Sequence, residues 1–328
     1  MTTIMIKSRP AAIASAPAPQ SGFALVVVIL VLLLATVLAA EMTFAVRTGT
    51  LEGFNLRQRL VGRALAQGAI NQALFELLDT PLDLDTEDER RYLGREEEGV
   101  LATGRLRYVV VNESGKIDLN GADRSLVTTF ADYIGLDEEG QAILADSLED
   151  WRDADNLHRL QGAEDDYYQE LQPPYRARHG RFTSVSELAL VRGATAITER
   201  FRLADLFTVH NPSGKINFNS LTPAMLAFVC LDDADKMALY HELRAKQGDL
   251  TALEARAILG EERYGECADF LTYNNNKVPF FTITATGYAG RQPEPAEEIR
   301  AQPGTRVTVL FEKKGLALRY YGWQEEWS

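Results

Sequence analysis

Cysteine and histidine are both scarce in this chain of 328 residues. Two cysteines, Cys230 and Cys267, are too few for a disulfide-dense scaffold. The four histidines show no paired spacing of the H-x-x-x-H kind, so we interpret them as surface or loop residues. The sequence also lacks G-x-S-x-G, a P-loop and G-x-G-x-x-G. No common catalytic or nucleotide-binding motif therefore indicates an enzyme.

Basic residues are also fewer than acidic residues. The chain has 34 Lys and Arg against 47 Asp and Glu, which gives a net charge of −13. A surface with this charge repels phosphate, so the composition disfavours nucleic acid as a partner. The acidic clusters instead favour a hard cation.

Proline is missing from Gly22 to Thr80, and the segment from Phe23 to Ala40 also lacks charge. As a helix, its eighteen residues would span about 27 Å, nearly the thickness of a bilayer's hydrocarbon core. Lys7 and Arg9 precede it without any acid, which predicts a cytoplasmic N-terminus. We therefore expect a single-pass membrane protein whose C-terminal domain is exported.

The residues after the apolar segment bear on whether it is removed. A secretory signal peptide cleaved near Val37-Leu38-Ala39 is one alternative. However, apolar residues recur at helical spacing as far as Leu77. We therefore predict one helix over residues 23–80, of which 23–40 cross the membrane.

Gly22-Phe23 followed directly by an apolar helix resembles the cleavage site of type IV prepilins. The resemblance implies a leader of residues 1–22, cleavage between Gly22 and Phe23 by a prepilin peptidase, and N-methylation of Phe23. Most pilins carry glutamate at the fifth mature position, where this chain has Val27. The K-type minor pseudopilin of type II secretion regularly lacks that glutamate. An ordinary bitopic anchor would also accommodate Val27 and stays an alternative.

The remaining pattern predicts an α+β fold. We expect strands at 105–111 and 280–290 and a hairpin over 305–323 that turns at Lys313-Lys314-Gly315, and we interpret the acidic segment 79–99 as a solvated loop. A long N-terminal helix followed by a small antiparallel sheet is the pilin-like pattern. The sheet would comprise residues 81–111 and 279–328, and the mainly helical residues 112–278 would form a large inserted domain.

The insert contains a repeat, because E-S-G-K-I-D-L-N at Glu113 recurs as P-S-G-K-I-N-F-N at Pro212. It predicts two related subdomains, residues 112–206 and 207–278, with Asn120 and Asn219 capping helices. These subdomains resemble SAM-like or helix-hairpin-helix modules, some of which bind DNA. The glycine hairpin used for DNA is missing here, so we expect no nucleic acid.

Residues 147–193 carry the most specific phrases, which are D-W-x-D-x-D, R-x-x-G-A-E, P-P-Y and E-L-x-x-V-x-G. They resemble the K-type pseudopilins, and with the prepilin site the resemblance covers nearly the whole mature chain. It implies a non-catalytic subunit that caps the tip of the type II secretion pseudopilus and helps start its assembly. It also implies I- and J-type minor pseudopilins as partners, with the apolar residues of Leu51–Leu77 as the seam between subunits.

The same resemblance implies calcium in the helical domain. We assign it first to Asp153, Asp155 and Glu164, and second to Asp150. The EF-hand pattern D-x-D-x-D-G is not met. The alternative is a solvated acidic loop whose carboxylates pair with Arg152 and Arg159.

Two other functions stay open. One is a minor pilin of a type IV pilus or DNA-uptake filament, which a basic stripe on the surface would favour. The other is a membrane-anchored periplasmic hydrolase, which a deep pocket with two facing carboxylates would favour. In the oxidising periplasm a disulfide between Cys230 and Cys267 is also possible.

Overall fold

The computed structural model describes residues 21–79, 94–273, 278–290 and 304–327. Most of the predicted leader and residues 80–93 of the acidic segment lie outside the described residues. The chain divides into two compact units, Met1–Arg57 and Gln58–Ser328.

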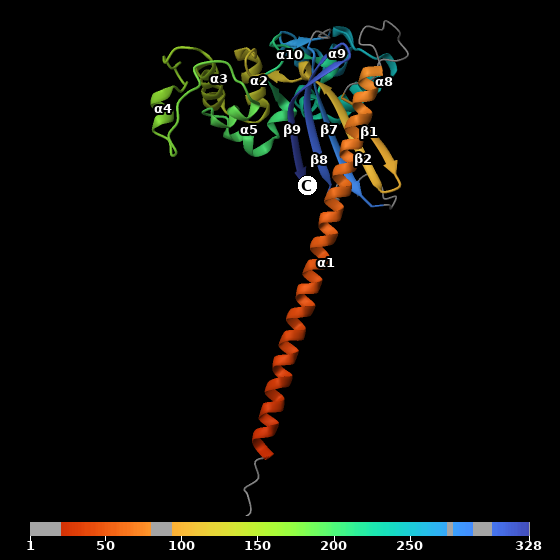
Figure 1. The fold of residues 1–328 in the computed structure, drawn as a ribbon. Helices are drawn as coiled ribbons and strands as arrows, with labels where there is room; N and C mark the ends of the chain where they lie inside the picture. The colour runs from red at the N-terminus through yellow and green to blue at the C-terminus, as the bar shows by residue number, and fades with distance from the viewer. Residues whose placement is uncertain (1–20, 80–93, 274–277, 291–303, 328) are drawn as a thin grey trace, which may run out of the picture. The chain divides into compact units, whose positions relative to one another are not determined.

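The predicted N-terminal helix is confirmed as α1, Ser21–Asp79 (Figure 1). It runs without interruption because no proline removes a backbone donor. Between Phe23 and Leu78 it is long and apolar enough to cross a membrane, and its most apolar window has no buried residue. The described side chains in the first half of α1 therefore form an exposed apolar surface.

The predicted antiparallel sheet is also confirmed, and it has five strands in the order β1-β2-β7-β8-β9. The strands are β1 (Glu96–Leu101), β2 (Gly104–Asn112), β7 (Phe280–Ala289), β8 (Thr305–Lys314) and β9 (Ala317–Trp327). Alternate residues of β2, β7 and β8 pack against the second half of α1 in one core. The alternation follows from the two-residue period of a strand.

Strand β1 corrects the interpretation of residues 79–99 as a solvated loop, because part of that segment pairs with β2. Its sequence, EEEGVL, shows no apolar alternation. An edge strand with no buried side chain needs none, since backbone hydrogen bonds and the ion pair of Arg107 with Glu96 (2.8 Å) hold it to its neighbour. The sequence pattern therefore carried no signal for this strand.

The expected seam on α1 also needs correction. Leu65, Ile70, Leu74 and Leu77 are buried against the chain's own sheet. They cannot contact another subunit while this core is intact. Exposed apolar residues of the segment, such as Leu60 and Phe75, stay available.

Two glycines set how closely α1 approaches the sheet. A Cβ added to Gly287 in β7 would lie 2.0 Å from the carbonyl oxygen of Gly62 in α1. A Cβ added to Gly62 would lie 2.8 Å from the carbonyl oxygen of Gly287. Both contacts are with backbone atoms, so neither can be relieved by turning a side chain.

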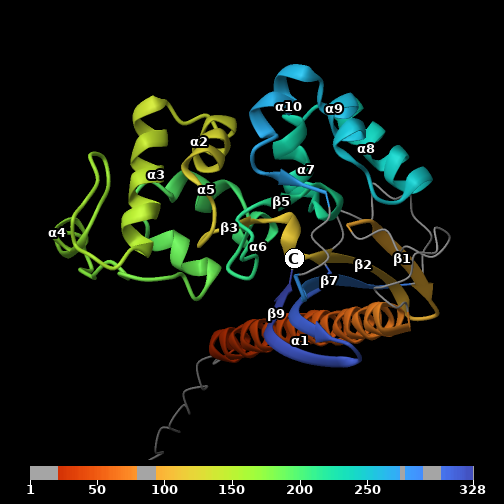
Figure 2. The same cartoon turned by 90° about the horizontal axis from the view of Figure 1, so that it is seen from above.

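Helices occupy the chain between β2 and β7 and have a core of their own (Figure 2). The α-helices are α2 (Arg124–Tyr133), α3 (Glu138–Arg152), α4 (Asp165–Gln169), α5 (Thr195–Arg200), α6 (Leu203–Leu206), α7 (Pro223–Cys230), α8 (Ala234–Gln247), α9 (Ala252–Leu259) and α10 (Glu261–Cys267). Short 3₁₀ helices cover Glu113–Gly115, Val185–Leu190 and Phe218–Ser220. The second of these contains Glu187 and Leu188 of the E-L-x-x-V-x-G phrase.

The two copies of the repeat make equivalent strand pairs. In the first, β3 (Ile117–Asp118) pairs in parallel with β4 (Phe207–Thr208). In the second, β5 (Ile216–Asn217) pairs in parallel with β6 (Leu271–Thr272). Each copy thus ties the start of a helical segment to its end. The division at 206/207 and the relation to SAM-like modules stay predictions.

The repeated asparagines do not cap helices, which corrects that expectation. Asn120 accepts a hydrogen bond from the Phe182 backbone N–H (2.7 Å) and donates to the Phe182 carbonyl (3.1 Å). Asn219 makes the same pair of bonds with Leu250, both at 2.8 Å. The caps of α2 and α7 are instead Asp123 and Thr222. The asparagines thus join distant loops, which a local pattern cannot indicate.

Replacing Gly287 with alanine should destabilise the protein by about 1–3 kcal/mol, because the new methyl group forces α1 away from the sheet. The control is Gly68→Ala, at a glycine of α1 where nothing lies within 4 Å of an added Cβ. That change should stabilise the helix by about 1 kcal/mol. Denaturant unfolding of the detergent-solubilised full chain measures both. Equal effects of the two substitutions would contradict the close approach.

Candidate metal centre

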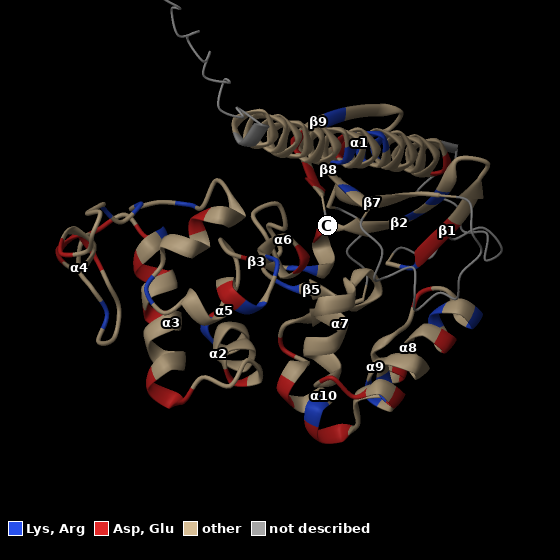
Figure 3. Cartoon of the chain, turned by 90° about the horizontal axis from the view of Figure 1, so that it is seen from below, with Lys and Arg blue, Asp and Glu red and all other residues tan. Residues whose placement is uncertain are grey.

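Three predicted calcium ligands lie on the loop that joins α3 to α4. Asp153 is the C-cap residue of α3, and Glu164 is the N-cap residue of α4. Asp155 lies in the loop, where its Oδ1 accepts a hydrogen bond from the Leu157 N–H at 2.9 Å. Figure 3 shows acidic residues, drawn in red, in and around α4.

The loop brings these three carboxylates together, because one oxygen from each lies within 4.8 Å of the others. Glu164 is only 1% exposed, and neither of its carboxylate oxygens has a hydrogen-bond partner in the described part of the chain. The same holds for Oδ1 of Asp153. Buried oxygens without partners are costly unless something else satisfies them. A hard cation, which takes oxygen ligands, fits this group.

The fourth candidate, Asp150, is not part of that group. It forms an ion pair with Arg159. The guanidinium Nη1 of Arg159 lies 2.5 Å from Asp150 Oδ1 and 2.7 Å from Asp153 Oδ2. Its Nε lies 2.7 Å from Glu149. Bonds to Asp153 and Asp150 hold the pKa of the Arg159 guanidinium above its usual range. Arg159 therefore neutralises one side of the acidic loop and leaves the other side open.

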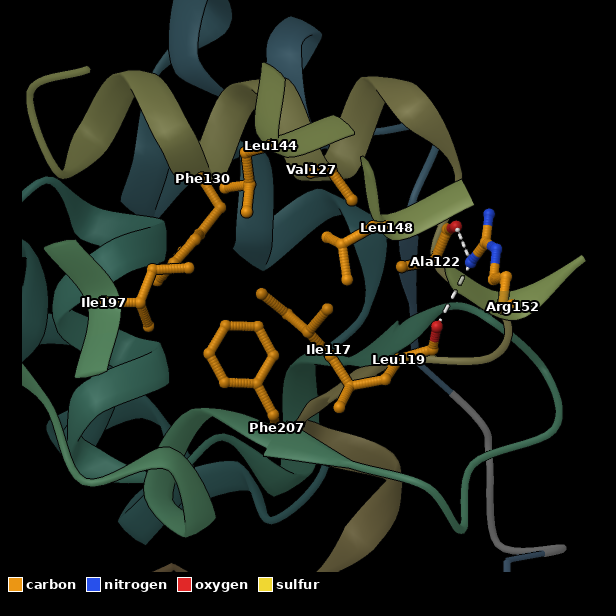
Figure 4. A pocket seen from close by; sticks show the side chains of 10 residues that line it. All are labelled: Ile117, Leu119, Ala122, Val127, Phe130, Leu144, Leu148, Arg152, Ile197 and Phe207. Atoms are coloured by element: carbon orange, nitrogen blue, oxygen red, sulfur yellow. Dashed lines mark hydrogen bonds between the residues drawn. The ribbon is translucent and has the colours of Figure 1, made fainter. Parts of the chain in front are cut away.

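The alternative, in which both Arg152 and Arg159 pair with the acids, holds for Arg159 alone among the described contacts. Arg152 donates through Nη1 to the carbonyl oxygens of Leu119 (3.2 Å) and Ala122 (2.9 Å), as Figure 4 shows. It thereby joins α3 to the loop before α2.

His179, interpreted from the sequence as a loop residue, lies beside the cluster. Its Nε2 is 3.1 Å from Asp165 Oδ1, and its Nδ1 is 3.5 Å from Glu164 Oε2. No sequence pattern indicated this neighbour, because fifteen positions separate His179 from Glu164.

The charge state of Glu164 reflects its surroundings. Burial raises the pKa of this carboxyl to about 7; His179 opposes the rise, and Asp150, Asp153 and Asp155 add to it. A cation bound among the carboxylates would favour the ionised form instead. Cation binding and proton release at Glu164 should therefore be coupled.

Aromatic side chains pack against one another next to the loop. Trp151 in α3 contacts Tyr168 at a ring distance of 5.2 Å and stacks on Phe182 at 6.3 Å. Tyr175, from the P-P-Y phrase, stacks on Tyr168 and donates to the Leu190 carbonyl. Residues of the most specific sequence phrases thus position the acidic loop.

The pocket in Figure 4 has a different character. It is lined by apolar residues and one charged residue, Arg152; the lining comprises Ile117, Leu119, Ala122, Val127, Phe130, Leu144, Leu148, Arg152, Ile197 and Phe207. No carboxylate lines it, so this pocket does not supply the facing acid pair expected of a hydrolase.

Both cysteines are buried free thiols in the structure. Burial raises the pKa of Cys230 to about 12 and that of Cys267 to about 11. The disulfide between them stays a prediction. The processing site also stays a prediction: Gly22 and Phe23 lie at the start of α1, with Val27 one turn further along it.

Residues 110–203 match the family described as "Type II secretion system (T2SS), protein K". Proteins called type II secretion system protein K are similar to this chain. The one from Pseudomonas aeruginosa is 28% identical over 257 residues, which are 70% of this chain and 74% of that protein. The one from Klebsiella pneumoniae is 26% identical over 259 residues, 73% and 74% of the two chains. The one from Aeromonas hydrophila is 37% identical over 106 residues, 31% of each.

A solved structure shares the fold. It is a chain in the crystal structure of the GspK-GspI-GspJ complex from enterotoxigenic Escherichia coli, with a TM-score of 0.53 and 15% identity. The match covers 85% of this chain and 99% of that chain. The resemblance inferred from the sequence phrases is therefore confirmed.

Replacing Glu164 with glutamine should stabilise the protein at pH 8 but not at pH 4.5 when a chelator removes divalent cations. With a raised pKa, the native carboxyl keeps its proton to higher pH than the unfolded one, so stability falls as pH rises from about 4.5 through about 7. The shift corresponds to about 3 kcal/mol, which glutamine avoids. Thermal melts across this pH range measure the effect.

The control for that experiment is Glu170→Gln, which changes an exposed acid of the same loop region. It should leave the pH profile of the wild type unchanged. A Glu164→Gln profile parallel to the wild-type profile would show that this carboxyl has an ordinary pKa.

Proposed function

Since this chain is a relative of the K proteins of type II secretion, we propose that it is a non-catalytic minor pseudopilin that caps the pseudopilus tip. In this role it helps start filament assembly for protein export across the outer membrane. The observation that carries the proposal is a pilin-like helix and sheet with a large helical insert between β2 and β7.

The insert supports a place at the tip. It leaves the sheet after Asn112 and returns before Phe281, and these two residues face each other in the β2–β7 ladder. All of α2 to α10 lies between these points. Subunits along a thin fibre must stack closely, and an insert of this bulk would obstruct the next subunit. A terminal subunit has no such neighbour.

Val27 supports the same place. A carboxylate in the membrane is costly unless it is paired. In pilins the usual glutamate is thought to pair with the terminal amine of a neighbouring subunit. A subunit at the tip has no subunit ahead of it, so valine at this position leaves no charge unpaired.

The proposal includes processing and partners. A prepilin peptidase would cleave between Gly22 and Phe23 on the cytoplasmic side of the inner membrane, and the C-terminal domain would lie in the periplasm. The fold neighbour comes from a GspK-GspI-GspJ complex. We propose I- and J-type minor pseudopilins as the partners of this chain too.

Calcium is part of the proposal. Asp153, Asp155 and Glu164 would supply carboxylate oxygens to the ion, and backbone carbonyls or water would supply the rest of the six to eight that Ca²⁺ takes. Because Asp153 ends α3 and Glu164 begins α4, bound calcium would tie the two helices together.

The mature chain extracted from the membrane should begin at N-methylated Phe23. Intact mass and N-terminal sequencing test this, with Gly22→Val expected to stay uncleaved and Ser21→Ala expected to be processed. A chain that begins at Ala40 would be a secreted soluble protein. An uncut wild-type chain would be a plain bitopic anchor. Either result would contradict the proposed role in a filament.

Calcium should raise the melting temperature of the full chain relative to the same protein in chelator, because it binds the native state alone. Asp153→Asn and Glu164→Gln should each lose most of this increase, and Glu170→Gln should keep it. Calorimetric titration gives the affinity directly. A wild-type melt that is unchanged by chelator would remove the calcium site.

A further inference from the structure

Strand β9 presents an aromatic strip, defined here as Tyr320, Trp323 and Trp327. Their exposed fractions are 54%, 48% and 36%. β9 is the free edge of the sheet at the end opposite β1 (Figure 1). Aromatic side chains of this size are the commonest anchors of protein interfaces.

The strip lies on the face of the sheet that packs against α1. Tyr320 pairs with Phe311 across the β8–β9 ladder, and Trp323 pairs with Val309. Phe311 and Val309 are wholly buried in the core under α1. Directly paired residues of neighbouring strands point to the same face. Tyr320 and Trp323 therefore project beside α1 rather than from the outer edge of β9.

The helix α1 covers only part of this face. The α1 core is built with residues of β2, β7 and β8, and of β9 only Leu318 packs at its margin. A helix about 10 Å across covers roughly two strands spaced about 4.8 Å apart. The face over β9 therefore has room for a second helix beside α1, at the usual separation of about 8–10 Å.

Two arginines of α1 contact residues of β9. Arg63 of α1 lies 3.1 Å from Glu325, and the Arg59 guanidinium lies 5.0 Å above the ring of Trp327. Leu60, which follows Arg59 on α1, is exposed. Tyr320 and Trp323 thus offer, together with Leu60, aromatic and aliphatic groups that suit an apolar helix.

We propose that the aromatic strip binds the N-terminal helix of a second pilin-like subunit, which lies on the sheet beside α1. This inference rests on the proposed function, since it names where on the chain an I- or J-type partner docks. Half-exposed aromatic side chains bury about 100 Å² each, so the strip supplies roughly a third of a usual interface half. It is the anchor of that interface, and exposed residues of α1 supply further area.

Photo-cross-linking in the full chain tests the contact. A photoreactive phenylalanine analogue replaces Tyr320 or Trp323 while the chain is co-expressed in membranes with the I- and J-type pseudopilins of its own organism. Both positions should cross-link to a partner's N-terminal helix, located by mass spectrometry. The control is the same analogue at Val100, which is 78% exposed on the opposite edge strand and should give no such product.

Each other product would overturn the inference. A cross-link within the chain, in place of one to a partner, would show that the chain itself covers the strip. A cross-link to a second copy would show self-association, and one to a partner's sheet would show edge pairing. No product at either position, with partners that still co-purify, would place their contact elsewhere.

Affinity supplies the second measurement. Trp323→Ala and Tyr320→Ala should each weaken co-purification of the partners about tenfold, and Val100→Ala should leave it unchanged. If the wild-type chain does not co-purify with the partners, the proposed assembly falls and the inference falls with it. If partners co-purify equally with all variants, only the docking site is wrong.

Discussion

The pairing of β2 with β7 is the constraint on which the rest of the structure depends. Asn112 faces Phe281 in this ladder, and its side-chain amide donates to the Val278 carbonyl at 2.8 Å. Just beyond, the buried pair of Glu113 and Lys116 is held by a hydrogen bond from Thr282. These contacts fix both ends of the insert at one place, so a helical domain can be added without breaking the sheet that α1 covers.

Inside the insert, the repeat supplies the rigidity that the acidic loop needs. Asn120 binds the backbone of Phe182, and Phe182 stacks on Trp151 one position before the end of α3. These contacts hold the end of α3, where Asp153 lies. Glu164 lies at the other end of the same loop, at the start of α4. The second copy uses Asn219 in the same way on Leu250. Here the same bond braces the second half of the insert, where no group of acids close enough to hold a metal ion lies among the described residues.

The acidic loop shows how one basic residue divides a cluster of like charges. Arg159 binds Asp150 and one oxygen of Asp153, so these carboxylates are satisfied in the fold. Both Glu164 oxygens and the other Asp153 oxygen are buried and have no hydrogen-bond partner among the described residues. Burial without a partner makes Glu164 hold its proton to about pH 7. These buried oxygens also leave a place for a cation. Their burial lowers the stability of the protein without the ion, and they can serve as ligands when the ion is bound.

The sequence by itself determined the elements whose signals are local. The apolar, proline-free run determined α1 to its end at Asp79, and alternation determined β2, β7 and β8. The resemblance to the K-type pseudopilins also indicated Asp153, Asp155 and Glu164 as candidate ligands, and one oxygen of each lies within 4.8 Å of the others in the structure. Only the tertiary structure decided the rest: β1 as an edge strand, the loop-joining bonds of Asn120, the withdrawal of Asp150 by Arg159, and the burial of Leu74 against the chain's own sheet. Each of these depends on a partner that is distant in sequence, or on which of several nearby acids an arginine binds. Neither produces a repeating pattern of residues that the sequence alone would reveal.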